Sequence, residues 1–243
     1  MMPGTYQNAH VEKFMQIALQ ISIIVEKGRL YENLTRTNLR LKAEILEHQK
    51  TAEQLRQAQS ELELANQQLV QLASRDGLTG VANRRTFDAT LVKEWHRCLR
   101  NGGLISLILI DIDGFKLYND SHGHLAGDDC LRLIAQTLQE SVRRPGDLVS
   151  RYGGEEFAVL LPETPLGPVY QLAESMRTAV EQKKLTCGRS SRSGFVTISL
   201  GVSTMHPRMD IDPSILVATA DLALYQAKEG GRNRTVVSPA SMI

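Results

Sequence analysis

The amino-acid sequence predicts an α/β domain of the α+β kind, with one mixed central sheet flanked by helices, preceded by a long coiled-coil helix. Two observations predict this. From residue 104 onward, short β-branched apolar runs and amphipathic stretches follow the order strand, helices, hairpin, helix, strand, helix, strand. Before residue 75 there is no proline after Pro3 and only Gly4 and Gly28 as glycines, so this part can be helical almost throughout. We therefore expect a helical dimerisation stalk at residues 1–74 and a globular domain at residues 75–243.

Residues 34–73 carry a heptad pattern. Its seam runs from Leu34 to Ala73 in alternating steps of four and three residues, which is the spacing of a coiled coil. The d positions are leucine except for His48, and the a positions are Asn, Ile, Ala, Gln, Asn and Ala. This pattern favours a weak, parallel two-stranded coil in fixed register. The alternative is one amphipathic helix packed on the domain, which the narrow seam and polar outer positions argue against.

Residues 14–25 are more hydrophobic than the heptad region that follows them. They resemble the helix that closes a sensory module such as a GAF domain. From this resemblance we expect that the chain has either lost an upstream sensory module or uses this helix only to dimerise.

Composition and charge narrow the class of protein. A net charge of +1 over 243 residues argues against a broad nucleic-acid or membrane-binding surface. The sequence has neither an apolar run of roughly 18 residues nor a signal-peptide pattern. Its three cysteines, Cys98, Cys130 and Cys187, lack metal-ligand spacing, which suits a reducing cytosol. We expect a cytoplasmic protein that binds no nucleic acid and has no membrane span.

Two acidic corners are the candidate functional features. Residues 104–113 form a short apolar run that ends in Asp111 and Asp113, which is typical of a strand buried on both faces. At residues 151–157, a Gly-Gly pair between apolar runs predicts a tight hairpin that presents Glu155 and Glu156. If the hairpin is considered alone, the alternative is that Glu155 and Glu156 are solvated surface charges that bind no metal. Because clustered carboxylates repel one another without a cation, both corners together predict a Mg²⁺ site.

Four separated motifs together closely resemble the GGDEF-domain family of diguanylate cyclases. They are residues 111–128, 151–157, 199–202 and 220–233, and the resemblance extends from about residue 76 to residue 237. It implies a palm-like nucleotidyl-cyclase domain that condenses two GTP into cyclic di-GMP and two pyrophosphates. It also implies a homodimer through the coiled coil, since each domain carries one nucleotide and half a site cannot turn over.

The resemblance assigns metal-binding and catalytic roles at the acidic corners. Mg²⁺ or Mn²⁺ is expected on Asp111, the carbonyl of Ile112, and Glu155. Glu156 and Lys116 are expected to support charge at the phosphates.

It also assigns the contacts with GTP. Asn119 and Asp128 are expected at the guanine edge, because a carboxylate accepts from the N1 and N2 hydrogens of guanine, a donor pair that adenine lacks. The expected phosphate contacts are the backbone amides of Gly114 and Phe115 and the side chains of Lys228 and Arg232. The last two are four residues apart, which on a helix puts them on one face. Gly114 replaces a bulkier residue common in the family. For His124 two roles stay open, a structural turn residue and a residue near the guanine base.

Arg144 and Asp147 match the family's inhibitory product site, so inhibition by cyclic di-GMP is expected. The family's frequent second arginine corresponds to Ser175, with Arg177 close by, so this inhibition is expected to be weaker. A turn without a ligand is the alternative.

Residues 76–80 join stalk and domain. Gly77 and Gly80 are expected to break the helix, and Asp76 or Thr79 to bond free amides at the start of the next one. Two other functions remain open for the whole chain: a catalytically silent receptor for cyclic di-GMP or GTP, and a purely structural coiled-coil adaptor.

Overall fold

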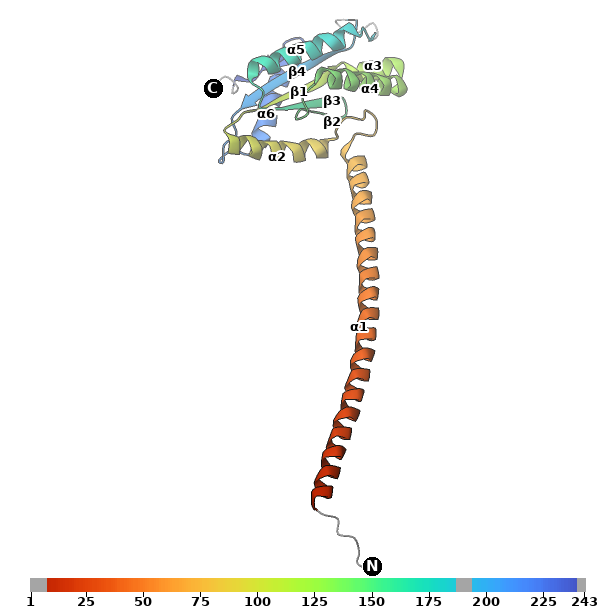
Figure 1. Ribbon diagram of the computed structural model, residues 1–243. Coiled ribbons are helices and arrows are strands. Elements are labelled where there is room, and N and C mark those ends of the chain that lie inside the picture. Colours follow the sequence, from red (N-terminus) through yellow and green to blue (C-terminus); the bar gives the residue numbers. More distant parts are fainter. Residues whose placement is uncertain (1–7, 187–193, 240–243) are drawn as a thin grey trace, which may run out of the picture. The chain divides into compact units, whose positions relative to one another are not determined.

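A computed structural model describes residues 8–186 and 194–239 (Figure 1), with side chains at residues 11–65, 74–186 and 194–239. The chain divides after residue 68 into two compact units, which are described separately. Among the described residues, no helix is both long and apolar enough to cross a membrane. Cys98 and Cys130 are buried, whereas Cys187 lies outside the described residues.

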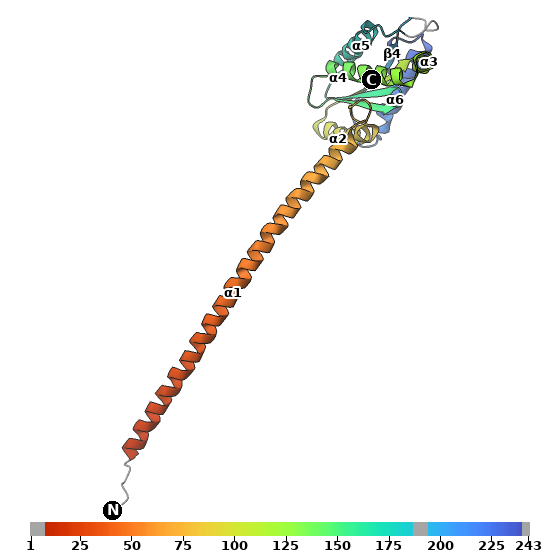
Figure 2. The same ribbon diagram turned by 90° about the vertical axis from the view of Figure 1, so that its right-hand side faces the viewer.

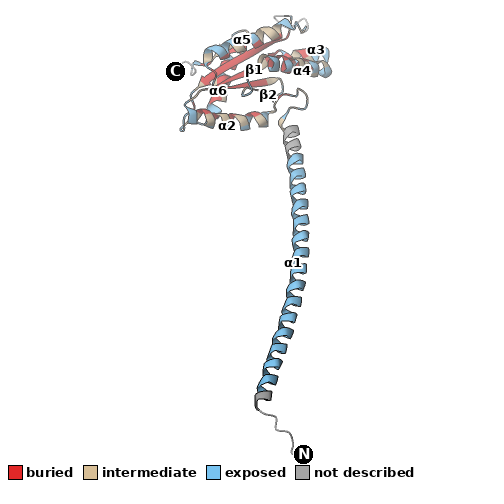
Figure 3. Cartoon of the chain, viewed as in Figure 1, coloured by how far each residue is buried: buried red, intermediate tan, exposed pale blue. Residues whose placement is uncertain are grey.

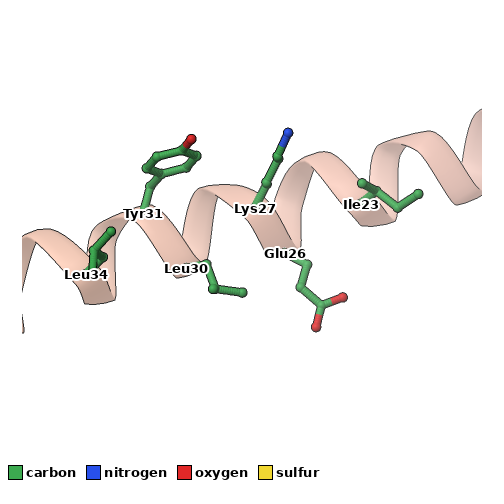
Figure 4. A pocket seen from close by; sticks show the side chains of 6 residues that line it. All are labelled: Ile23, Glu26, Lys27, Leu30, Tyr31 and Leu34. Atoms are coloured by element: carbon green, nitrogen blue, oxygen red, sulfur yellow. The ribbon is translucent and has the colours of Figure 1, made fainter.

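Helix α1, Asn8–Ser74, is continuous over 67 residues, as the scarcity of glycine and proline predicts. Its described side chains up to residue 65 are exposed (Figure 3). They include seam leucines, with Leu34 58% and Leu62 71% exposed. Figure 4 shows one apolar stretch of this helix, where Ile23, Leu30 and Leu34 border a shallow hollow on the helix surface. This surface is of the kind that a second helix covers in a coiled coil.

The second unit is built on a five-stranded sheet in the order β2-β3-β1-β4-β5. The strands are β1 (Ile105–Asp113), β2 (Leu148–Gly153), β3 (Glu156–Pro162), β4 (Thr197–Met205) and β5 (Thr235–Val237). All neighbouring pairs are antiparallel except β4 and β5, which are parallel. The predicted mixed sheet is therefore confirmed, with the apolar run of β1 at its centre.

Helices cover both faces of the sheet (Figures 1 and 2). The five are α2 (Arg84–Asn101), α3 (Phe115–His122), α4 (His124–Ser141), α5 (Leu166–Gln182) and α6 (Ser214–Glu229). On one face, Ile110 and Ile112 pack with the apolar side chains of α3, α4 and α5. On the other, Leu107 and Leu109 pack with α2 and α6. Because side chains alternate along a strand, Asp111 and Asp113 belong to the α2/α6 face.

The hairpin is confirmed, but its turn lies one residue later than predicted. Gly153 pairs with Glu156, and the register shifts between Arg151 and Gly153, so the turn residues are Gly154 and Glu155. Gly154 has φ of 27°, a conformation that glycine adopts readily. The irregular register moves Glu155 into the turn itself and leaves Glu156 as the first residue of β3.

Two helices, α3 and α4, follow β1, because Gly123 between them has φ of 85° and does not continue α3. One helix start differs from the prediction. The N-cap of α2 is Asn83, whose side chain accepts from the Thr86 amide at 3.0 Å, rather than Asp76 or Thr79. Asp76 instead accepts from the Thr79 amide at 2.9 Å, which closes the junction turn on itself.

Candidate metal and nucleotide site

Asp111 lies at the centre of the candidate site. Its Oδ2 is 2.7 Å from Nζ of Lys228 on α6, and its side chain is only 14% exposed. Across the sheet its Cα partner on β3 is Glu156. Burial raises the pKa of Asp111, the ion pair with Lys228 opposes this, and the nearby charges of Glu155 and Asp113 raise the pKa further, so that it lies above its ordinary value. The structure thus brings together Asp111, Glu155 and Lys228 from three separate motifs.

These residues fit a divalent cation. Two carboxylates of like charge lie close enough for Glu155 to affect the pKa of Asp111, and a cation between them would relieve this repulsion. Ile112 lies between Asp111 and Asp113 in β1, and its side chain has no ligand atom, so its backbone carbonyl is the group that could bind a metal. Within the described part of the chain there is no group of three or more His, Cys, Asp or Glu residues able to hold a metal. Two carboxylates and one backbone carbonyl are oxygen ligands, and such ligands suit Mg²⁺, which completes its octahedron with waters and substrate phosphates rather than with a protein cage.

Asp113 has a different role from its neighbour Asp111. Its carboxylate accepts from Thr197 Oγ1 at 2.8 Å, Ser199 Oγ at 2.7 Å and the Asn233 amide at 3.0 Å. Three donors thus hold this carboxylate at the end of β1, whereas the partner of Asp111 is Lys228. The alternation of Thr197 and Ser199 on one face of β4 was the sequence signal for these partners.

Arg151 anchors the turn that carries Glu155, a contact that the sequence did not reveal. Its Nε and Nη2 donate to the Gly154 carbonyl at 2.9 and 2.8 Å. Its Nη1 lies 3.1 Å from Oδ1 of Asp76 at the junction. Burial would raise the pKa of Asp76, but hydrogen bonds from Thr79 and the contact with Arg151 lower it overall. One guanidinium thus connects the junction with the turn of the candidate site.

The predicted guanine contacts come from α3 and α4. Asn119 on α3 packs against Gly127 so closely that a Cβ at Gly127 would lie 1.8 Å from Asn119 Oδ1. This Oδ1 is buried and has no hydrogen-bond partner among the described residues. Asp128, the next residue after Gly127, is half-buried. A buried acceptor without a partner is unfavourable, and an N–H of a bound base can satisfy it.

The predicted phosphate contacts at α3 begin directly after β1. Gly114 has φ of 70° and is the N-cap of α3, so a left-handed residue, which glycine adopts without strain, connects strand and helix. Phe115 is buried and Lys116 is exposed in the first turn. The amides of Gly114 and Phe115 therefore lie at a helix start, where phosphates bind favourably. His124 begins α4 and is exposed, which leaves both interpretations of it open.

Arg232 does not share a helix face with Lys228, contrary to the sequence prediction. Helix α6 ends at Glu229, and Arg232 follows in a left-handed conformation with φ of 64°. The Gly230-Gly231 pair before it explains this break, because two glycines do not sustain a helix. Lys228 lies in the last turn of α6 and Arg232 in the turn that follows the helix, so this turn, and not helical geometry, sets their relative positions.

The predicted inhibitory site is a turn. The Asp147 amide donates to the Arg144 carbonyl at 3.1 Å, and Nη1 of the exposed Arg144 lies 3.2 Å from Thr164 Oγ1. Burial raises the pKa of Asp147 despite the opposing charge of Arg144. Arg177 does not replace the missing second arginine here, because its guanidinium is held by Glu174, Glu181 and Asn233. Ser175 lines a cavity of about 640 Å³ together with Arg143 and Lys183.

Comparison with known proteins relates the whole arrangement to one family. The family model described as "Diguanylate cyclase, GGDEF domain" matches residues 73–234. The chain is 35% identical to diguanylate cyclase VdcA of Vibrio cholerae over 94% of its own length and 62% of VdcA. It is 42% identical to response regulator PleD of Caulobacter vibrioides over 69% of its length and 36% of PleD. The chain thus spans less than two thirds of these curated relatives.

Solved structures agree with the sequence relatives. The coiled coil and GGDEF domain of DgcB from Caulobacter crescentus, in complex with c-di-GMP, superimposes with a TM-score of 0.66 at 32% identity, covering 76% of this chain and 97% of that one. Diguanylate cyclase SiaD of Pseudomonas aeruginosa, in complex with its activator SiaC, gives a TM-score of 0.66 at 31% identity, covering 95% and 87%. This chain belongs to the family of GGDEF diguanylate cyclase domains.

Proposed function

We propose that this protein is a diguanylate cyclase that condenses two GTP into cyclic di-GMP and two pyrophosphates, using Mg²⁺ or Mn²⁺. The observation that carries the proposal is the convergence of Asp111, Glu155 and Lys228 at the end of β1, with Lys228 Nζ 2.7 Å from Asp111. Acidic and basic groups that meet in this way suit a metal-bound triphosphate. Relatives named diguanylate cyclases support the proposal.

In the proposed reaction, the 3′-hydroxyl of one GTP attacks the α-phosphorus of the other, and pyrophosphate leaves. Asp111, Glu155 and the Ile112 carbonyl would hold the cation, which supplies positive charge at the phosphates and makes ionisation of the hydroxyl easier. Lys228 exchanges its contact with Asp111 for one with the triphosphate. Glu156 and Lys116 support charge around the phosphates.

The proposal includes further contacts with the nucleotide. Asn119 and Asp128 orient guanine, and the buried Asn119 Oδ1 without a partner supports this assignment. The amides of Gly114 and Phe115 bind phosphate at the start of α3, and Arg232 binds the triphosphate from the turn after α6. Binding both the base and the phosphates fixes the α-phosphorus in position for attack.

Two domains have to meet for turnover, because each carries one nucleotide. The exposed heptad seam of α1 supports a parallel homodimer in which residues 1–74 act as the stalk and residues 75–243 as the catalytic domain. A coiled coil raises the effective concentration of one domain near the other. The proposal also includes a cytoplasmic location, and it keeps both alternatives for residues 14–25, a lost upstream sensory module or a helix that serves only to dimerise.

Cyclic di-GMP is proposed as an inhibitor at Arg144 and Asp147. An arginine can stack on guanine and pair with it, and Asp147 can accept its N–H groups. Because Arg177 is bound to three other residues, a second arginine from this position is not available, so we expect weak inhibition.

Product analysis tests the proposal directly. The purified chain is incubated with Mg²⁺ and either GTP or ATP, and the nucleotides are resolved by chromatography. Cyclic di-GMP from GTP, and no cyclic dinucleotide from ATP, is the expected result. Binding of GTP or cyclic di-GMP without turnover would instead identify a silent receptor, and absence of any nucleotide binding would identify a structural adaptor.

A further inference from the structure

The segment after α6 has an unusual backbone. Gly231, Arg232 and Asn233 have φ of 113°, 64° and 46°, so three successive residues lie at positive φ. For residues with a Cβ this conformation is unfavourable, and it persists only when surrounding contacts hold it. Because Arg232 is proposed to bind phosphate, the contacts that hold this backbone conformation also affect the candidate site.

Asn233 has hydrogen bonds to two different elements. Its amide donates to Asp113 Oδ2 at 3.0 Å, at the end of β1. Its side-chain Oδ1 accepts from Arg177 Nη1 at 2.9 Å, and its Nδ2 donates to Glu181 Oε1 at 2.8 Å, both on α5. Asparagine tolerates the left-handed region better than most residues, so its backbone preference and its side chain agree at this position.

Asp113 is itself fixed by the sheet. It is 8% exposed, and the hydroxyls of Thr197 and Ser199 on β4 donate to its two oxygens at 2.8 and 2.7 Å. A continuous set of contacts therefore runs from β4 through Asp113 to Asn233. Asp111, two residues before Asp113, carries the proposed metal, so one strand sets the positions of both the metal ligand and the turn after α6.

We propose that Asp113 and Asn233 form a latch that positions Arg232 for the triphosphate. Both are positioning residues that act through Arg232 and do not touch the metal or the nucleotide. The inference rests on the proposed function, since it assigns the triphosphate as the group that Arg232 meets. In this proposal Asp113 supports the turn that carries Arg232 and does not bind the metal.

A double-mutant cycle tests the latch through binding. The affinity of a non-hydrolysable GTP analogue with Mg²⁺ is measured by calorimetry for wild type, Asn233→Ala, Arg232→Ala and the double variant. We expect each single change to weaken binding about tenfold, the scale of one lost charge-assisted contact. Because Asn233 acts through Arg232, the double variant should bind within about twofold of Arg232→Ala. If the fold-loss of affinity in the double variant equals the product of the two single fold-losses, the latch is overturned.

Two further measurements separate positioning from general loss of structure. GMP has no β- or γ-phosphate, so its affinity should be unchanged in Asn233→Ala, and equal weakening of GMP and GTP analogue would overturn the latch. Like Asn233→Ala, Asn233→Gly keeps the backbone amide that donates to Asp113, but glycine accepts positive φ without strain, so this variant should lose less affinity than Asn233→Ala. It also replaces the alanine variant in the cycle if that variant unfolds.

Failure of the latch and failure of the proposed function give different results. A wild-type chain that binds the GTP analogue but makes no cyclic di-GMP would contradict the proposed synthesis, and a non-additive cycle would still support the latch. Synthesis with additive losses would contradict the latch alone. A wild-type chain that does not bind the analogue would contradict both.

Discussion

Replacing Arg151 by methionine tests the connection between the junction and the turn that carries Glu155. The guanidinium makes two hydrogen bonds to the Gly154 carbonyl, at 2.9 and 2.8 Å, and pairs with Asp76, the two side chains being 19% and 22% exposed. Methionine keeps much of the apolar stem and removes the charge. Charge-assisted hydrogen bonds contribute roughly 1.5–3 kcal/mol each, and partial exposure reduces the contribution of the ion pair. We expect the free energy of unfolding to fall by about 2–4 kcal/mol.

The assay combines urea denaturation with steady-state synthesis of cyclic di-GMP under conditions where the variant is fully folded. We expect kcat to fall about tenfold or more, because a shift of the turn moves Glu155 relative to Asp111 and positioning has large effects on rate. Asp76→Asn is the matched control, since it removes the charge but leaves Gly154 held by Arg151. If Arg151→Met were as stable and as active as this control, the turn would not depend on the guanidinium.

Three further predictions concern packing, pH and inhibition. In Gly201→Ala, the new Cβ would lie 2.2 Å from the Ala220 carbonyl oxygen on α6, so urea denaturation should show a loss of about 3 kcal/mol. Gly167→Ala, in the first turn of α5 with no atom within 4 Å, should instead gain up to ~1 kcal/mol; equal effects would contradict the close packing of α6. Because burial raises the pKa of Asp111, protons should compete with Mg²⁺, and the half-activating Mg²⁺ concentration should rise as the pH falls. Because the pKa of Asp111 is raised in the folded state, protonation of this carboxyl favours folding, so the change in Mg²⁺ requirement should not be caused by unfolding. A half-activating Mg²⁺ concentration that does not change with pH would contradict this prediction. Arg144→Ala should relieve inhibition when cyclic di-GMP is titrated into the synthesis assay, and unchanged inhibition would remove the turn at residues 144–147 from consideration.

The sequence was most informative where a residue type has one physical use. The apolar run before Asp111 predicted the central strand because a strand buried on both faces is hydrophobic at every position. The scarcity of glycine and proline before residue 75 likewise predicted α1. These features depend on local composition, which a single sequence displays in full.

The sequence predictions failed where contacts between residues far apart in the sequence determine the local structure. The hairpin turn moved by one residue because Gly153 pairs with Glu156, a register that a Gly-Gly pair does not specify. Arg232 lies beyond the end of α6, and the next residue, Asn233, donates to Asp113, which is 120 residues away in the sequence. Periodicity cannot report such partners, since they become neighbours only in the folded sheet.

The most direct test of the central claim is a Mn²⁺ titration followed by electron paramagnetic resonance, with a non-hydrolysable GTP analogue bound to wild type and to Glu155→Gln. The amide keeps the size of the side chain and removes the charge that contributes to the raised pKa of Asp111. We predict that the wild type binds Mn²⁺ tightly, that Glu155→Gln binds it at least about tenfold more weakly, and that this variant makes no cyclic di-GMP. Equal Mn²⁺ affinity and undiminished synthesis in Glu155→Gln would contradict a cation site shared by Asp111 and Glu155.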